Sequence, residues 1–299
     1  MLSFVDGAEG SKINLPDFII CGTQKGGTTA LRMYLHQHPC IYIPKREIHF
    51  FSWYFNKGVG WYAKHFRYNS SHYVCGEKSP SYMFHAQEVA ERMKEILPSP
   101  KLIFMLRDPV KRAYSEYWMM VLNGKEKLSF DEAIWKKDRD YLIRGHYAKQ
   151  IKEFLKYFDR ENMMVIISED FKKNREKRMW DVFDFLGIEQ IRLKMPNIHV
   201  GGIPRSKFLL KLAGISTRLS MMAWDSPSFR NFFCDVRSAI KRINRVEGQK
   251  PKMSEETRKK LYEYFKPQNE ELISLLNEIH FQNLAEIVKK EWNGKSGVE

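Results

Sequence analysis

The sequence predicts an α/β fold of three layers, with a central parallel sheet flanked by helices and a helical C-terminal extension. Short continuous apolar runs alternate with helix-like stretches from about residue 17 to residue 196. Such runs are typical of strands buried on both faces, as in parallel sheets. A turn rich in glycine and threonine, Gly22–Thr29, separates the first run from the first helix, in the strand–loop–helix order of a P-loop.

The elements follow in order along the chain. Phe18–Cys21 is an apolar run that ends in glycine, and Ala30–Leu35 has the apolar spacing of an amphipathic helix. Further strands are expected at Ile41–Ile43, Tyr73–Cys75, Lys101–Leu106 and Met163–Ile167, and helices at about 86–97, 109–123, 147–158 and 175–186. Strands that alternate with helices predict a parallel sheet covered on both faces.

The pattern changes after residue 196, where strand-like runs stop. Phe208–Arg245 mixes apolar, basic and aromatic residues without a clean period. A last helix is expected from about Ser254, a good N-cap followed by Glu255 and Glu256 in the first turn. We therefore expect one domain over residues 1–299, made of a lead-in (1–16), a core (about 17–205) and a helical extension (about 206–299).

The composition favours a globular protein that binds anions. Fifty Lys and Arg against 36 Asp and Glu give a formal charge of +14, which attracts nucleotides, acidic sugars, nucleic acid or acidic membranes. The apolar content, 43%, is too high for a disordered chain. No apolar run is long enough to span a bilayer, and no secretory signal is visible. Cys21 and Cys75 lie in strand-like runs, which indicates buried thiols and a cytoplasmic protein.

The loop Gly22–Thr29 predicts an anion site. Free backbone N–H groups and the dipole of the following helix both point at such a loop, and its glycines let a ligand approach the backbone. A P-loop would continue with Lys-Ser/Thr after Gly27, but here Thr28 and Thr29 follow and the lysine, Lys25, lies inside the loop. The alternative is a structural glycine turn with a solvated lysine. The context of strand, loop and helix favours anion binding.

A second anion site is expected at the end of the strand Lys101–Leu106. Arg107 follows this strand, and ligands of open α/β sheets bind outside the carboxyl ends of the strands. Pro109 suits the first turn of the next helix, on which Ser115 lies about two turns further along. In the alternative interpretation, Arg107 pairs with Asp108 or another carboxylate.

Taken together, these segments resemble the sulfotransferases that use 3′-phosphoadenosine 5′-phosphosulfate (PAPS), most closely the heparan sulfate type and its bacterial relatives. The segments that carry the resemblance are Gln24–Thr29, Lys45–Phe51, Gly76–Tyr82 and Leu106–Pro109 with Ser115. They occur in the same order over roughly residues 17–205. The combination is far more specific than any single motif.

The resemblance implies a role for each of these segments. The 5′-phosphosulfate would be bound by Lys25, Gly26, Gly27, Thr28 and Thr29. Arg107 and Ser115 would bind the 3′-phosphate, and Lys78 would lie beside Glu47 and the sulfate. The reaction would move the sulfuryl group in line to a hydroxyl or an amine and release 3′,5′-ADP, without a metal.

Glu47 and His49 are the acid–base candidates. They are two residues apart, so on an extended segment their side chains share a face. Sulfuryl transfer needs a base for the acceptor proton and positive charge where the bridging oxygen leaves. Glu47 suits the base, as in the heparan-type enzymes, while Lys25 and His49 suit the charge. The alternatives are a surface ion pair of Glu47 with its basic neighbours and a hydrogen-bonded core histidine.

The acceptor stays open at this point. Gly201–Lys207 is a basic loop, and a similar segment closes over the donor in bacterial relatives, which makes Arg205 a candidate clamp. It departs from the closing loop of the animal heparan enzymes, so either a glycan or a lipid, polyketide or other small alcohol remains as acceptor. Two alternatives of another class are a P-loop-type kinase and a basic nucleic-acid-binding protein. No recognition motif accompanies the scattered lysines, so no nucleic-acid partner is expected.

Overall fold

The computed structural model describes residues 14–66, 74–138, 140–196, 203–206 and 251–292, together with short stretches between 208 and 246. The chain divides into two compact units. Unit 1 comprises Met1–Pro109, Arg144–Asn197 and Tyr262–Glu299, and unit 2 comprises Val110–Ile143 and Ile198–Leu261. The single domain with a helical extension stays a prediction. The C-terminal third contributes residues to both units.

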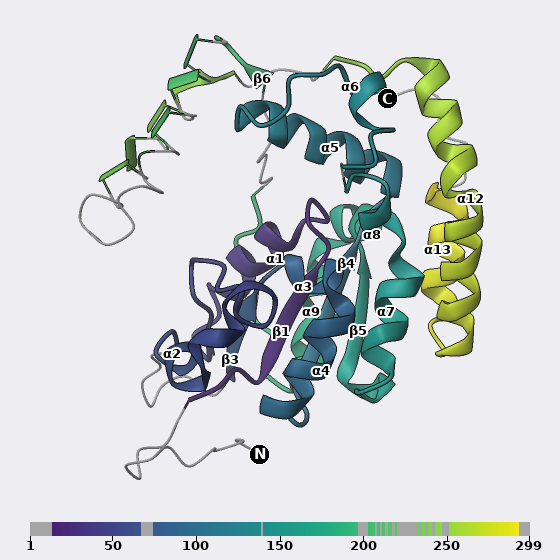
Figure 1. The fold of residues 1–299 in the computed structure, drawn as a ribbon. Coiled ribbons are helices and arrows are strands. Elements are labelled where there is room, and N and C mark those ends of the chain that lie inside the picture. The colour runs from purple at the N-terminus through teal and green to yellow at the C-terminus, as the bar shows by residue number, and fades with distance from the viewer. Residues whose placement is uncertain are drawn as a thin grey trace. The chain divides into compact units, whose positions relative to one another are not determined.

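Unit 1 contains a five-stranded sheet in the order β2-β3-β1-β4-β5, and every neighbouring pair is parallel (Figure 1). The strands are β1 (Phe18–Gly22), β2 (Ile41–Tyr42), β3 (Val74–Lys78), β4 (Lys101–Leu106) and β5 (Met163–Ile167). The predicted parallel sheet is thereby confirmed. Strand β3 continues past the apolar run, because Glu77 and Lys78 pair with Ile19 and Ile20 of β1.

The helices of unit 1 cover both faces of this sheet. They include α1 (Thr28–Leu35), α2 (Val59–Ala63), α3 (Ser81–Phe84), α4 (Ala86–Ile96), α7 (Tyr147–Leu155), α8 (Ser168–Lys173), α9 (Arg175–Leu186) and α13 (Gln282–Trp292). Buried side chains of α4, α7 and α13 form one core with alternate residues of β1 and β4, such as Ile19 and Phe104. Residues of the opposite parity, such as Ile20 and Ile103, are equally buried and face the other side, where α1 and α9 lie (Figure 1).

Two local features of unit 1 differ from the expectations. The segment at Glu47 is not extended through His49, which has a left-handed φ of 56° and begins the π-helical turn η1 (Phe50–Tyr54). In place of one last helix there are two, α12 (Glu255–Glu278) followed by α13. Ser254 caps α12, because its hydroxyl oxygen accepts a hydrogen bond from the Thr257 N–H. Cys21 and Cys75 are buried free thiols, as predicted.

Unit 2 contains most of α5 (Pro109–Leu122) and the short helix α6 (Phe130–Ala133). Arg112 is fully buried and pairs with Glu116 at 2.5 Å. Strands were not expected here, yet β6 (Ile203–Pro204) and β7 (Arg245–Val246) form a small antiparallel pair. Two-residue strands leave no hydrophobic pattern in a sequence, which explains the miss. Within the described ranges, no helix is both long and apolar enough for a membrane span.

Candidate active site

The carboxyl ends of the parallel strands bring the predicted site residues of unit 1 to one edge of the sheet. Strand β1 leads into the loop that contains Lys25, β3 ends at Lys78, and β4 is followed by Arg107. These strands are neighbours in the sheet, with β1 between β3 and β4. Segments that are more than 80 residues apart in sequence therefore meet at this edge, because Arg107 Nη1 donates to the Lys25 carbonyl at 3.3 Å.

The donor loop, which we define as Gly22–Thr29, is packed tightly against the end of β4. A Cβ on Gly26 would lie 2.3 Å from the Met105 carbonyl oxygen, so only glycine fits there. Gly27 has a φ of 104°, a conformation that side chains rarely adopt, and it is the N-cap of α1. The first N–H groups of a helix have no partner within it. The loop therefore presents the N-terminus of α1, where anions bind favourably, and anion binding there stays a prediction.

Lys25 lies within this loop, and the Arg107 side chain contacts its backbone carbonyl. Lys25 itself has a left-handed φ of 70°, which is uncommon for a residue other than glycine. The Arg107 Nε atom is buried, and in the described part of the chain it has no hydrogen-bond partner. An arginine N–H that is buried without an acceptor is costly. A ligand oxygen would satisfy it, so the arrangement fits an anion.

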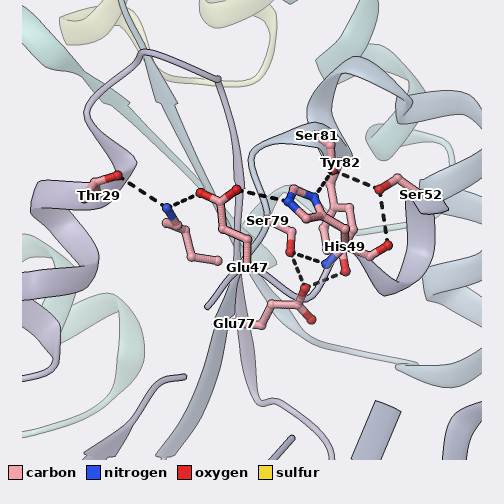
Figure 2. A network of polar contacts seen from close by, with 9 residues as sticks. Thr29, Glu47, His49, Ser52, Glu77, Ser79, Ser81 and Tyr82 are labelled. Carbon is pink, nitrogen blue, oxygen red and sulfur yellow. Dashed lines mark hydrogen bonds and ion pairs between the residues drawn. The ribbon is translucent and has the colours of Figure 1, made fainter. Parts of the chain in front are cut away.

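Lys78 connects the donor loop with the predicted base. Its Nζ lies 3.4 Å from Thr29 Oγ1 and forms an ion pair with Glu47 Oε1 (Figure 2). Only 5% of the Lys78 side chain is exposed, against 38% of the Glu47 side chain. The carboxylate is thus reachable from solvent on one side and bound to a buried cation on the other.

Glu47 is ionised at neutral pH in this arrangement. Burial raises the pKa of its carboxyl, but the hydrogen bond from His49 and the charge and hydrogen bond of Lys78 outweigh burial and lower the pKa to about 2. An ionised carboxylate only accepts hydrogen bonds. His49 Nε2, 3.0 Å from Glu47 Oε2, is therefore the donor of that bond.

The other ring nitrogen of His49 contacts one serine, which in turn contacts a second. His49 Nδ1 lies 2.6 Å from Ser81 Oγ, which lies 2.9 Å from Ser52 Oγ. In the neutral ring Nδ1 accepts, because Nε2 carries the proton, and Ser81 then donates. Trp53 stacks on the imidazole, with ring centres 4.0 Å apart, and stays 55% exposed.

Several polar groups at this edge were missed by the sequence reasoning, in which Ser81 was only part of a motif and Ser52 was not considered. Glu77, directly before Lys78, is fully buried and accepts hydrogen bonds from three hydroxyls, those of Tyr62, Ser79 and Tyr82. Burial raises its pKa, although these hydrogen bonds act in the opposite direction. A glutamate inside an otherwise apolar strand was the one signal that could have indicated this cluster.

The alternative that paired Arg107 with Asp108 finds little support. Asp108 is fully buried, its carboxylate accepts from the Tyr262 hydroxyl at 3.0 Å, and its N–H donates to Glu169. Ser115 and Arg205 belong to unit 2. Arg205 is exposed, and its backbone N–H donates to the Asn244 carbonyl at 2.7 Å. Their roles at the donor stay predictions.

Comparison with known proteins identifies relatives of this chain. The family model "Sulfotransferase domain" matches residues 15–198. The human heparan sulfate glucosamine 3-O-sulfotransferase 3A1 is 33% identical over 191 residues, which cover 61% of this chain and 47% of the relative. The mouse bifunctional heparan sulfate N-deacetylase/N-sulfotransferase 4 is 28% identical over 293 residues, which cover 89% of this chain and 30% of the relative. The chain spans about half the length of the 3-O-sulfotransferases that it matches.

A solved structure extends the likeness to the fold. The sulfotransferase from Alicyclobacillus acidocaldarius superposes with a TM-score of 0.57 at 29% identity, covering 68% of this chain and 92% of that chain. The family model matches well over half of the sequence and includes β1 to β5 with the donor loop, Glu47, Lys78 and Arg107. These findings favour a sulfotransferase over the kinase and nucleic-acid-binding alternatives. The chain belongs to the sulfotransferase family.

Proposed function

We propose that this chain transfers the sulfuryl group of PAPS to an acceptor hydroxyl or amine and releases 3′,5′-ADP. One observation carries the proposal. Lys78 Nζ lies between Thr29 of the donor loop and the carboxylate of Glu47, so a single buried cation joins an anion site to a base. Sulfuryl transfer requires such a junction. The acceptor loses its proton to a base and must attack sulfur in line with the bond that breaks.

The donor loop and Arg107 are the proposed binding groups for the donor, which is here a substrate. The N-terminus of α1 and the side chain of Lys25 would hold the 5′-phosphosulfate. Arg107, with its buried Nε, would meet the 3′-phosphate, since arginine forms charge-assisted bonds to phosphate oxygens. Ser115 and Arg205 are further candidates for the 3′-phosphate end of the donor. No metal is required by this set of residues.

In the proposed reaction, the acceptor oxygen forms a bond to sulfur while the bond between sulfur and the phosphate oxygen breaks. Glu47 takes the acceptor proton, and Lys25 neutralises the charge that develops on the leaving phosphate. With a pKa of about 2, the carboxylate of Glu47 is a weak base in the structure described here. A sulfuryl oxygen that attracts the Lys78 ammonium away from Glu47 would raise this pKa and strengthen the base.

A carbohydrate is the acceptor that we propose. Relatives that are about a third identical carry heparan sulfate in their names. Beside Glu47, the exposed Trp53 offers an aromatic surface of the kind that sugar rings stack on. Arg32 adds a positive charge that interacts with Glu47: burial lowers the pKa of Arg32, and the negative charge of Glu47 partly offsets this effect. The alternative acceptor is a lipid, polyketide or other small-molecule alcohol.

Two measurements test this function. Calorimetric titration should show 3′,5′-ADP binding to the wild-type chain without added Mg²⁺, and Arg107→Ala should weaken it about 10- to 150-fold, the loss of a charge-assisted hydrogen bond. Arg46→Ala, which removes an exposed arginine, is the matched control. A screen of ³⁵S-labelled PAPS against heparan sulfate, phenols and acyl-chain alcohols should label the polysaccharide. Binding of Mg·ATP with no binding of 3′,5′-ADP would contradict the proposal.

A further inference from the structure

The end of β3 carries a buried carboxylate, Glu77, that the proposed chemistry does not use. Its side chain is fully buried. Ionisable groups are almost never buried to this degree unless hydrogen bonds compensate the lost hydration. The hydroxyls of Ser79 and Tyr82 donate to Oε1 (Figure 2). The hydroxyl of Tyr62 donates to Oε2. The carboxylate is therefore the common acceptor of three hydroxyls, and we call Glu77 with Tyr62, Ser79 and Tyr82 the hub.

Two of these hydroxyls continue to the segment that carries His49. Ser79 Oγ accepts from the His49 N–H at 2.9 Å, and the Tyr82 hydroxyl accepts from the Phe51 N–H at 3.3 Å. Both N–H groups lie at the start of the turn η1, where backbone N–H groups have no partner within the turn. Each relay runs from N–H through O–H to the carboxylate, which suits a group that only accepts.

The backbone conformation held by these relays is uncommon. His49 has a φ of 56°, in the left-handed region, which is energetically unfavourable for a residue other than glycine. Such a conformation persists only where surrounding contacts over-determine it. From this position, the ring of His49 reaches Glu47 Oε2 at 3.0 Å. The conformation thus has a direct consequence for the predicted base.

We propose that Glu77 is a positioning residue: through Ser79 and Tyr82 it fixes the backbone of His49–Phe51 and thereby aims the His49 ring at Glu47. The inference rests on the roles proposed above for Glu47 and His49. Glu77 does not touch the reacting atoms and acts through the relays. Tyr62 bonds the same carboxylate through the other oxygen and lies outside both relays, so the hub contains its own control.

The test compares three variants that each remove one hydroxyl from the hub. Tyr82→Phe and Ser79→Ala break the relays, whereas Tyr62→Phe removes a hydrogen bond of the same carboxylate and leaves both relays in place. Phenylalanine keeps the ring contacts of Tyr82 with Phe51 and of Tyr62 with Phe50. All three variants are expected to lose a similar amount of stability in chemical denaturation, because in each the buried carboxylate loses one donor.

Amide exchange and kcat should distinguish the three variants, although their losses of stability are similar. In Tyr82→Phe and Ser79→Ala, amide hydrogen exchange at His49 and Phe51 should accelerate. The kcat for ³⁵S transfer from PAPS to heparan sulfate should fall about 10- to 100-fold, as expected for a misplaced catalytic group. The Kd for 3′,5′-ADP should stay unchanged. Tyr62→Phe should keep both the exchange rates and kcat of the wild-type chain.

A double-mutant cycle with His49→Ala tests the route of the effect. Without the imidazole there is nothing to aim, so Tyr82→Phe should lower kcat no further in the His49→Ala background. An additive loss would contradict a role through His49. A variant that fails to fold is replaced by the other relay variant, since Ser79→Ala and Tyr82→Phe carry the same expectation.

The possible failures are distinguishable. Full activity of Glu47→Gln would overturn the proposed base, whatever the hub variants do. If Glu47→Gln is inactive while Tyr82→Phe and Ser79→Ala match Tyr62→Phe in kcat and in amide exchange, the positioning role alone is overturned. The exchange measurement needs no acceptor, so equal exchange at His49 and Phe51 in all three variants overturns the inference even if heparan sulfate is not sulfated.

Discussion

The two halves of the site are built in different ways. The donor loop, Gly22–Thr29, relies on backbone: glycine at positions where a Cβ would collide, and free N–H groups at the start of α1. The base side, Glu47–Trp53, relies on side chains that are held by hydroxyls and carboxylates from β3 and α3. Backbone sites are defined by local sequence, whereas side-chain networks depend on tertiary contacts. The two halves should therefore respond differently to substitution.

The largest effect is expected at Lys78, the residue that joins the two halves. Lys78→Met keeps an unbranched apolar stem but removes the cation between Thr29 and Glu47. We expect kcat to fall about 100- to 1,000-fold, the usual cost of one lost electrostatic stabiliser. The measurement is ³⁵S transfer from PAPS to heparan sulfate. Lys94→Met, which replaces an exposed lysine of α4, is the control. Equal rates of transfer in the two variants would show that Lys78 does not join the two halves of the site.

Gly26→Ala should damage the donor half alone. Its Cβ would lie 2.3 Å from the Met105 carbonyl oxygen, so the loop must shift. We expect 3′,5′-ADP to bind about tenfold more weakly and the chain to lose about 1–3 kcal/mol of stability. Gly60→Ala in α2 is the matched control, since nothing lies within 4 Å of a Cβ there. Unchanged nucleotide affinity in Gly26→Ala would show that the loop does not bind the donor.

Ser81→Ala should affect the base half alone. The variant removes the hydroxyl 2.6 Å from His49 Nδ1, so the ring loses the bond that fixes its tautomer. The bond from Nε2 to Glu47 remains, so only one of the two contacts of the ring is lost. We expect a fall in kcat of about 2- to 10-fold, the value of one hydrogen bond, with the Kd for 3′,5′-ADP unchanged. The ¹⁵N shifts of the His49 ring should move toward a mixture of tautomers. A wild-type tautomer in Ser81→Ala would remove this role from Ser81.

The smallest expected effect is on the pH dependence of the free energy of unfolding. The pKa of Glu47 is lowered from 4.5 to about 2, so its contribution to stability is present above about pH 4.5 and is lost as the pH falls toward 2. Glu77 acts with the opposite sign, because burial raises its pKa. Chemical denaturation of wild type and Glu47→Gln should therefore converge as the pH falls from 5 toward 2, since the contribution of Glu77 cancels in the difference. A difference that is independent of pH would contradict the Glu47 ion pair.

The sequence predicted the backbone features well. The bounds of β4 and β5 coincide with the apolar runs, and the glycines of the donor loop lie where a tight turn was expected. Lys78 and Glu47 were paired through the family resemblance, and the structure places them in contact. These successes share a cause: hydrophobic periodicity and glycine positions are local signals.

The parts that the sequence did not predict depend on distant contacts. The left-handed turn at His49 is stabilised by Ser79 and Tyr82, some 30 residues further along the chain. The burial of Glu77 follows from its place in β3, between partners in the sheet and the hydroxyls that surround it. Nothing in the local pattern of Lys45–Phe51 indicates that the extended segment bends at His49.

The most direct test of the central claim, that a base and an anion site meet at Lys78, is one pair of measurements on Glu47→Gln. We expect the variant to bind 3′,5′-ADP with the affinity of the wild type and to transfer ³⁵S from PAPS about 100- to 10,000-fold more slowly. Glu95→Gln, an exposed glutamate of α4, should behave as the wild type in both assays. Wild-type transfer by Glu47→Gln would contradict the account.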